Sequence, residues 1–116
     1  MKIVKSVEEA VNSTNIKPGS VIYTSGNAAT PQVLLKQLGD DLSIKHVALY
    51  GVLLLGDQFG SLFTQERCQT LTHRVLFNSH LTREVVNRGW GKYHPMHLSE
   101  IPKYARWEDG PNVALV

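Results

Sequence analysis

The chain has 116 residues, 42% of them hydrophobic, which is the size of one ordinary domain with enough apolar material for a buried core. Its 12 Lys and Arg residues against 10 Asp and Glu residues give a formal net charge of +2. Because the basic residues are dispersed, this balance argues against a protein that binds nucleic acid or an anionic membrane surface. The single cysteine, Cys68, excludes an internal disulfide framework. We therefore expect one domain, residues 1–116, in a reducing compartment.

The sequence lacks the patterns of a secretion signal and of a membrane span. A lysine lies on either side of Ile3 and Val4, and acidic residues follow, so the start of the chain lacks the apolar core of a secretory signal. The longest apolar run, residues 47–55, is about half as long as a membrane span. A cytoplasmic protein is expected.

The first part of the chain predicts a helix, a strand and a second helix. The sequence SVEE at residues 6–9 is a capping-box pattern, which predicts a short first helix. Residues 20–25 (SVIYTS) are β-branched and aromatic, as is typical of a strand. Thr30 is expected to cap the next helix and Pro31 to be its first residue. The apolar spacing predicts that this helix spans residues 31–42.

The middle of the chain predicts a buried strand and a long loop. Residues 46–55 (HVALYGVLLL) form a nearly continuous apolar run, the pattern of a strand covered on both faces in the centre of a parallel sheet. Residues 56–72 are polar and weakly patterned, so we expect a long loop with one helical turn at residues 64–69. Such long connections are often functional. A strand is predicted at residues 74–78, followed by a helix at residues 81–88.

The last third continues the alternation of helix and strand. Thr82 is expected to cap the helix at residues 81–88, and Gly89 to end it. Residues 93–98 are expected to be extended. Ser99 is expected to cap a turn that contains residues 100–102, and residues 104–107 to complete that short helix. Residues 112–116 (NVALV) are predicted to begin a final apolar strand.

This order of elements predicts an α/β fold, a three-layer sandwich with a mainly parallel sheet and right-handed crossovers. The final strand is unusual, because an apolar strand of this kind is normally buried on both faces. Two interpretations stay open. The strand inserts into the middle of the sheet, or a further segment or a partner chain completes the sheet around it.

Four stretches follow one another along the chain as landmarks. They are YTSGNAATPQ at residues 23–32, FNS at 77–79 with REVVNRG at 83–89, HLSEIP at 97–102, and NVALV at 112–116. In this order and spacing they resemble the N-terminal domain of the acetyl-CoA hydrolase/transferase family, and within it the 4-hydroxybutyrate (butyrate-type) CoA-transferases. The resemblance covers nearly the whole chain. It implies a CoA-transferase-like N-terminal domain that belongs to a longer, two-domain enzyme.

The resemblance also implies a chemistry. Enzymes of this family exchange CoA between an acyl-CoA and a small carboxylic acid through a glutamate nucleophile, which forms an acyl anhydride and then a glutamyl-CoA thioester. The family's nucleophilic glutamate and its Gly-rich oxyanion segment belong to the C-terminal half. The resemblance therefore implies that this chain holds no catalytic residue and is inactive alone.

The same resemblance implies substrates and partners. Coenzyme A or acyl-CoA and a small carboxylate would be substrates, with no tightly bound cofactor. The partner would be the missing C-terminal domain or a second chain, and a homodimer is one such arrangement. The chain departs from many relatives at Gly26 and Asn27, where they have Gly-Gly, and at residues 80–82 (HLT), where they have a Gly-containing stretch. The acyl substrate therefore does not follow from the family.

The loop after the first predicted strand is the main candidate binding site. Its residues are Gly26, Asn27, Ala28, Ala29 and Thr30. Their small side chains leave room for a ligand to approach the backbone N–H groups, and a helix N-terminus favours a phosphate or carboxylate. The loop also follows a strand, where open α/β sheets place ligands. The alternative is an ordinary helix entry after a buried strand.

Two further pairs of polar residues follow strands. Asn78 and Ser79 can contact a carboxylate substrate or the pantetheine amides of CoA. The alternative, which we favour slightly, is a local turn in which their side chains satisfy nearby backbone groups. Ser99 and Glu100 follow an extended segment, and we interpret the carboxylate of Glu100 as a complement to the helix dipole rather than as a general base.

The histidines and the cysteine do not predict a metal site or a nucleophile. His94 and His97 are three residues apart, and on a strand this spacing sends side chains to opposite faces. The other three histidines are expected to be structural or exposed. Arg67 can lower the pKa of the neighbouring Cys68 thiol, but the sequence offers no partner base.

Three functions therefore stay open. The first is the N-terminal domain of an acyl-CoA:carboxylate CoA-transferase or acetyl-CoA hydrolase. The second is a stand-alone α/β module that binds a phosphorylated small molecule at residues 26–30. The third is a structural or oligomerisation subunit whose sheet edge pairs with a partner.

Overall fold

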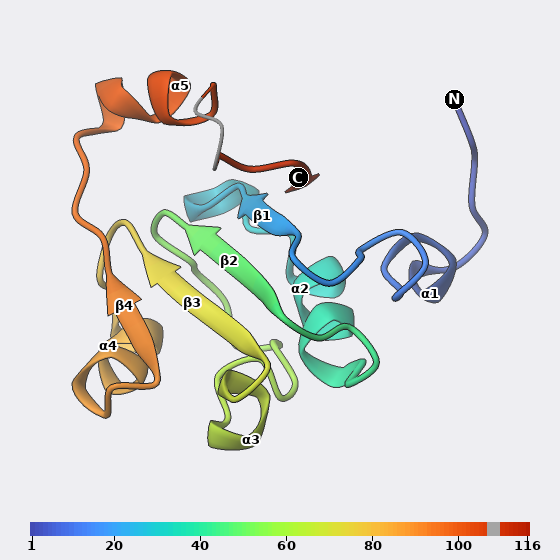
Figure 1. Cartoon of the computed structure of the whole chain (residues 1–116), viewed down its shortest axis with the longest axis horizontal. Helices are drawn as coiled ribbons and strands as arrows, with labels where there is room; N and C mark the ends of the chain where they lie inside the picture. The colour runs from blue at the N-terminus through green and yellow to red at the C-terminus, as the bar shows by residue number, and fades with distance from the viewer. Residues whose placement is uncertain (107–109) are drawn as a thin grey trace.

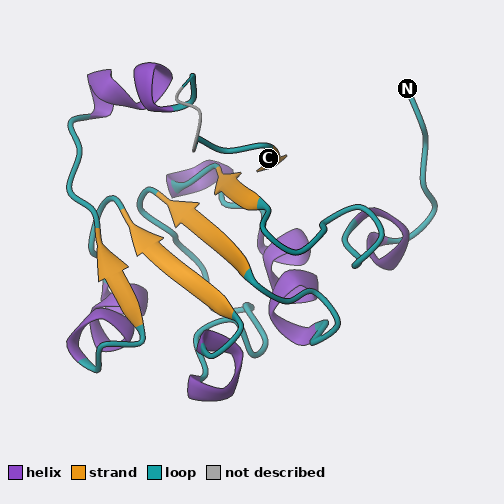
Figure 2. Ribbon diagram, viewed as in Figure 1, coloured by secondary structure: helices purple, strands orange, loops and turns teal. Residues whose placement is uncertain are grey.

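A sheet of five parallel strands organises the chain, which the computed structural model describes over residues 1–106 and 110–116 (Figures 1 and 2). Each pair of neighbouring strands is parallel. In spatial order the strands are β4 (Gly91–Tyr93), β3 (Leu71–Val75), β2 (Val47–Gly51), β1 (Val21–Thr24) and β5 (Val113–Leu115). The predicted α/β class with a mainly parallel sheet is confirmed.

Helices cover the two faces of this sheet unequally. The crossovers from β1 to β2, β3 and β4 all step in the same direction, and they carry α2 (Gln32–Asp40), α3 (Gln65–Cys68) and α4 (His80–Asn87). Because such crossovers are right-handed, these helices pack on one face, which we call the helical face. Figure 1 shows the chain after β4 rising past the arrowheads of the strands to α5 (Ile101–Tyr104), which follows η2 (Leu98–Glu100). Tyr104 of α5 packs against Tyr50 on the face opposite the helical face, which we call the α5 face.

The helical face holds the larger hydrophobic core. In β3, Leu71, His73 and Val75 are buried, whereas Thr72 and Arg74 are half-buried. This alternation assigns the first three side chains to the helical face and the other two to the α5 face. The fully buried apolar side chains of this core include Ile22, Leu49, Leu71, Leu35 and Leu38. The short first helix, α1 (Val7–Ala10), lies beside α2.

The α5 face holds a smaller cluster. Tyr50, Leu76 and Tyr104 are each 2% exposed and pack together. The ring centroids of Tyr50 and Tyr104 are 4.8 Å apart. In the described part of the chain, η2 and α5 are the helical elements on this face, and both are short. None of the described helices is long and apolar enough to cross a membrane.

The central strand is confirmed, and the strand beside it is displaced from its predicted position. β2 lies in the middle of the sheet, and residues 47–50 are all buried. The prediction of a strand at residues 74–78 is wrong, because the pairing with β2 runs from Leu71 to Val75. The polar side chains of Thr72 and His73 concealed this start. They are compatible with the strand because Thr72 lies on the partly covered α5 face and His73 is hydrogen-bonded inside the core.

Two predicted helix caps are corrected. Ser79, not Thr82, is the N-cap of α4, and Thr82 lies in the first turn, where its Oγ1 accepts the Ser79 amide at 3.0 Å. Pro31 is the N-cap of α2, so it is not the first helical residue. Thr30 does not cap this helix because its hydroxyl bonds to two loop groups described below.

The C-terminal part differs most from prediction. Residues 93–98 were expected to be extended, but β4 ends at Tyr93 and η2 begins at Leu98. The short helix predicted to begin with a turn at residues 99–102 is present as η2 and α5, but α5 ends at Tyr104, and Trp107 lies outside the described residues. β5 lies at the edge of the sheet beside β1, not in its middle, and Ala114 is exposed.

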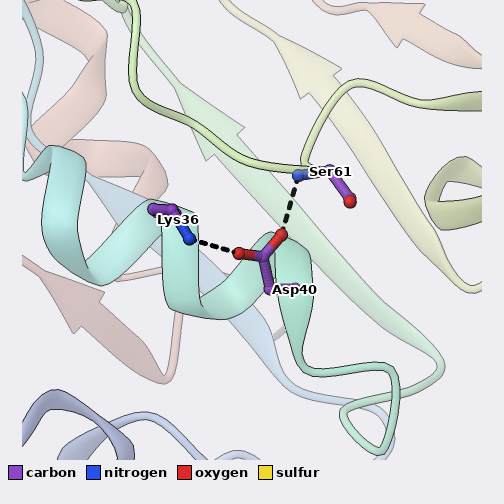
Figure 3. A network of polar contacts seen from close by, with 3 residues as sticks. All are labelled: Lys36, Asp40 and Ser61. Carbon is purple, nitrogen blue, oxygen red and sulfur yellow. Dashed lines mark hydrogen bonds and ion pairs between the residues drawn. The ribbon is translucent and has the colours of Figure 1, made fainter.

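The long connection after β2 is anchored to α2. Figure 3 shows that Asp40, the last residue of α2, accepts from Lys36 Nζ at 2.6 Å and from the Ser61 amide at 2.9 Å. The contact with Lys36, followed by that with Ser61, lowers the pKa of the Asp40 carboxyl. At Gly39 a Cβ would lie 2.5 Å from the amide nitrogen of Leu62. A glycine is therefore required where the helix and this connection touch.

A buried arginine joins the same elements and was not predicted. The helical turn expected near residue 65 is α3, and the side chain of its Arg67 is 0% exposed. Its Nε and Nη2 donate to the Leu38 carbonyl at 3.2 and 3.1 Å, and Nη1 donates to Thr70 Oγ1 at 2.8 Å. Burial lowers the pKa of the guanidinium. Arg67 thus satisfies a carbonyl in the last turn of α2, where helices leave such groups unpaired.

Candidate functional site

The loops that follow β1, β2 and β3 meet at the carboxyl edge of the sheet, the edge where open parallel sheets place ligands. These loops contain residues 25–31, 52–58 and 76–79. The first and third hold all of the predicted binding residues. Because β2 lies between β1 and β3, the loop after β2 separates the two predicted groups. The structure therefore places them on one edge but on non-adjacent strands.

The loop after β1 uses most of its amides within the chain. It forms a 3-10 turn, η1 (Asn27–Ala29). The Asn27 amide donates to the Leu53 carbonyl at 2.7 Å, and the Ala29 and Thr30 amides donate to the carbonyls of Gly26 and Asn27 at 3.1 and 3.2 Å. Within the described part of the chain, the amides of Gly26 and Ala28 have no hydrogen-bond acceptor. These two remain as candidate donors to a ligand.

The glycine of this loop is explained by the neighbouring loop. A Cβ at Gly26 would lie 2.8 Å from the Leu53 carbonyl oxygen. Thr30 Oγ1 donates to the Asn27 carbonyl at 2.7 Å and accepts the Leu55 amide at 3.2 Å. The loops after β1 and β2 are therefore joined along their length. Neither the glycine nor the threonine requires a ligand to account for it.

Asn78 and Ser79 form a local turn at the start of α4. Ser79 is 5% exposed and Asn78 is exposed. Thr82 Oγ1 lies 3.0 Å from Asn78 Oδ1 and accepts the Ser79 amide at 3.0 Å. This arrangement agrees with the local turn that we favoured from the sequence. The exposed Asn78 amide nitrogen stays accessible from the carboxyl edge.

A cavity of about 270 Å³ lies beside this turn and was missed in the sequence. It opens between the carboxyl ends of β3 and β4. Its lining residues include Leu76, Phe77, Tyr93, Met96, His97 and Glu100. Phe77 and Tyr93 are 47% and 54% exposed, which is high for aromatic side chains next to strand ends. The aromatic residue at the end of β4 and the one shortly after β3 were the signal that could have identified this cavity.

A second cavity of about 390 Å³ lies between α5 and the strands β1 and β5. Tyr23, Ile101, Tyr104 and Val113 are among its mainly apolar walls. From β1 the chain continues to β2 on one side of β1, and after β4 it returns to β5 on the other side of β1. The space between β1 and β5 is therefore the point where the strand order reverses, a second location where open sheets bind ligands.

The titratable groups of the chain mostly have structural environments. His73 is 2% exposed, its Nε2 lies 2.8 Å from the Leu62 carbonyl, and burial lowers its pKa to about 4. Burial is the larger effect on the Cys68 thiol and raises its pKa, although the charge of Arg67 acts in the expected direction and lowers it. Glu100 accepts the His97 amide at 3.2 Å in the turn η2, a capping contact.

The two histidines considered as a pair lie after β4 and not on a strand. The argument from opposite strand faces therefore does not apply to them. The ring of His94 instead packs edge-on against Tyr50, with centroids 5.7 Å apart. Tyr104 also adjoins the ring of His94. Burial is the main cause that raises the pKa of Tyr104, and its contact with Tyr50 adds to this effect. Together these side chains form an aromatic cluster under α5.

Comparison with solved structures finds this fold in RipA from Yersinia pestis, with a TM-score of 0.74 and 22% sequence identity. Two RipA mutants match with TM-scores of 0.79 and 0.78 at 22% and 21% identity. Each match covers 95% of this chain and 27% of the RipA chain, so the chain spans about a quarter of that length. At this identity the likeness shows the fold alone. No protein-family model matches the chain, and no curated protein matches its sequence.

Proposed function

We propose that this chain is the N-terminal domain of an acyl-CoA:carboxylate CoA-transferase or acetyl-CoA hydrolase, and that the nucleophilic glutamate lies on polypeptide outside its 116 residues. The observation that carries the proposal is the likeness to RipA over 95% of the chain. We interpret the shared fold as CoA-transferase-like. The family landmarks, in the same order along the sequence, support this interpretation independently.

In this proposal the carboxyl edge binds CoA and forms part of the acyl pocket. The free amides of Gly26 and Ala28 would face an anionic group, and a helix N-terminus adds positive potential there. The amide side chain of Asn78 would donate to a pantetheine carbonyl. The aromatic walls formed by Phe77 and Tyr93 would contact the apolar part of the same ligand. Transfer itself then requires the carboxylate of the second domain.

The first test is chemical. The 116-residue chain is incubated with acetyl-CoA and treated with hydroxylamine or borohydride. We expect neither CoA transfer to a second carboxylate nor a trapped glutamyl thioester on this polypeptide. A hydroxylamine-sensitive label on any of its own glutamates would refute the assignment of the nucleophile to another segment.

The second test is binding. Calorimetry should detect the binding of CoA. It should detect no binding of adenosine 3′,5′-bisphosphate, which lacks the pantetheine arm. Asn78→Ala should weaken CoA binding about threefold to tenfold, the loss of one or two hydrogen bonds. Asn87→Ala is the matched control, because Asn87 is an exposed asparagine at the other end of α4. Equal affinities of the two variants would argue against a role of Asn78 in binding.

A second candidate function is a stand-alone module that binds a phosphorylated small molecule at residues 26–30. The two free amides of this loop favour it. It differs from the first proposal in one measurable respect, since sugar phosphates would bind as tightly as CoA. Affinity that depends on pantetheine would exclude it.

A third candidate is a structural or oligomerisation subunit. It is favoured by the position of β5, which pairs with β1 on one side and forms the outer edge of the described sheet. Unpaired strand edges promote association of chains. Sedimentation at several concentrations tests it, and a monomer at all of them would exclude it.

A further inference from the structure

A polar groove of about 340 Å³ lies at the amino end of the sheet, opposite the carboxyl-edge loops. Register places Val21, Ala48 and Thr72 side by side on the α5 face, and Tyr50 and Arg74 form the next row along the strands. The small side chain of Ala48 at the centre leaves a hollow beside the bulkier row. Polar residues of the loops before the strands, Gln69, Thr70 and His46, complete its walls.

The guanidinium of Arg74 is held in place at this groove. Its Nη1 donates to the hydroxyl of Tyr50 at 2.6 Å, and its Cζ lies 5.2 Å from the centroid of the same ring. Tyr50 is buried, so it offers a fixed support. An arginine has five N–H donors, and the contact with Tyr50 uses one of them. Arg74 is half-buried, and in residues 1–106 and 110–116 no carboxylate forms an ion pair with it.

A second cation lies next to Arg74. In the parallel pairing of β3 with β4, Arg74 is directly opposite Lys92, and both side chains are on the α5 face. Like charges in directly opposed positions of a sheet repel each other. An anion bound between or beside them would relieve this repulsion. None of the described residues that line the groove is acidic, and Glu66 lines a neighbouring cavity that shares Gln69 and Thr70 with it.

We propose that this groove binds an oxyanion of the phosphate type through Arg74. The planar fork of a guanidinium matches two oxygens of a phosphate, and the hydroxyl of Thr72 provides a further donor in the groove. Lys92 does not line the groove, but its positive charge next to Arg74 favours a dianion over a monoanion. The groove differs from the proposed CoA contacts because most of its walls come from the first residues of β1, β2 and β3 and the loops before them, with Arg74 farther along β3, whereas those contacts come from the loops after the strands.

The test is an NMR titration of the full chain with inorganic phosphate at constant ionic strength, and acetate serves as the carboxylate probe. We expect saturable shifts of the Thr70 and Thr72 amides with millimolar affinity, and weaker binding of acetate. Arg74→Gln should weaken phosphate binding at least about tenfold. Arg88→Gln is the matched control, because Arg88 is exposed, pairs with Glu84 at 2.8 Å and should leave the affinity unchanged.

Three results would overturn the proposal: no saturable shift at these amides, equal affinity in Arg74→Gln, or acetate binding as tightly as phosphate. Thr72→Val keeps the shape of the side chain and is the second variant if Arg74→Gln does not fold. It should weaken phosphate about threefold, and an unchanged affinity would contradict the predicted contact. Shifts confined to the Gly26 and Ala28 amides would place the anion at the other edge of the sheet and would also refute the site.

Discussion

The two faces of the sheet satisfy their polar side chains differently. On the helical face, the buried side chains of Arg67 and His73 bond to the carbonyls of Leu38 and Leu62 inside a packed core. On the α5 face, which holds the smaller hydrophobic cluster, Arg74 is half-buried and Lys92 is exposed. The comparison indicates that the helical face provides most of the stability. The α5 face keeps donor capacity that a ligand or partner can use.

The strongest test of this comparison removes one apolar side chain from each of the two faces. Leu49→Ala on the helical face should lower the free energy of unfolding by about 2–5 kcal/mol, because a fully buried side chain leaves a cavity. Val21→Ala on the α5 face should cost about 1 kcal/mol, since Val21 is half-buried and the change removes fewer carbon atoms. Urea denaturation measures both. Equal losses would contradict the assignment of the main core to the helical face.

Acid should destabilise the helical face through His73. The pKa of His73 is about 4 in the folded chain against an ordinary value of 6.5, because burial disfavours the charged ring. The unfolded chain therefore binds the proton more readily. The stabilisation is complete above the ordinary pKa, declines as the pH falls toward the folded pKa, and amounts to about 3 kcal/mol in all.

Denaturant unfolding across this pH window measures the effect. His73→Gln keeps an N–H donor for the Leu62 carbonyl and cannot titrate, so the loss of stability over the window should be smaller in the variant. The same pH dependence in both proteins would show that other groups cause it.

The smallest expected effect concerns the two arginines. Arg67→Met removes a buried guanidinium and leaves the Leu38 carbonyl without its donors, so we expect a loss of about 1–3 kcal/mol. Arg88→Met removes an exposed ion pair with Glu84, which should cost less than about 1 kcal/mol. Thermal unfolding of the two variants makes the comparison. An unchanged stability of Arg67→Met would mean that removing the desolvation cost of the buried guanidinium offsets the lost hydrogen bonds.

Prediction from the sequence succeeded where the local sequence of an element was enough to define it. The apolar run beginning at Val47 identified the central strand, and Gly89, with a φ of +74°, ends α4 as expected. Prediction failed where a neighbour decided the outcome. β3 begins at Leu71 because it pairs with β2, and the hydroxyl of Thr30 bonds to the loop after β2 instead of capping α2.

The candidate sites show the same division. The sequence identified residues 26–30, 78 and 79, and the structure places them on the carboxyl edge as strand order requires. The sequence did not indicate which amides of the first loop remain free, because that depends on the loop after β2. Nor did it indicate the groove at Arg74, since its walls come from three strands and the loops before them.

The sequence by itself determined the alternation of strands and helices, the burial of the central strand and hence the parallel α/β class, because these depend on local periodicity. Tertiary structure alone decided that β5 lies at the edge, that Arg67 and His73 are buried, and that Arg74 lies opposite Lys92. Those outcomes depend on register and on contacts between segments far apart in the chain, which periodicity along the sequence does not encode.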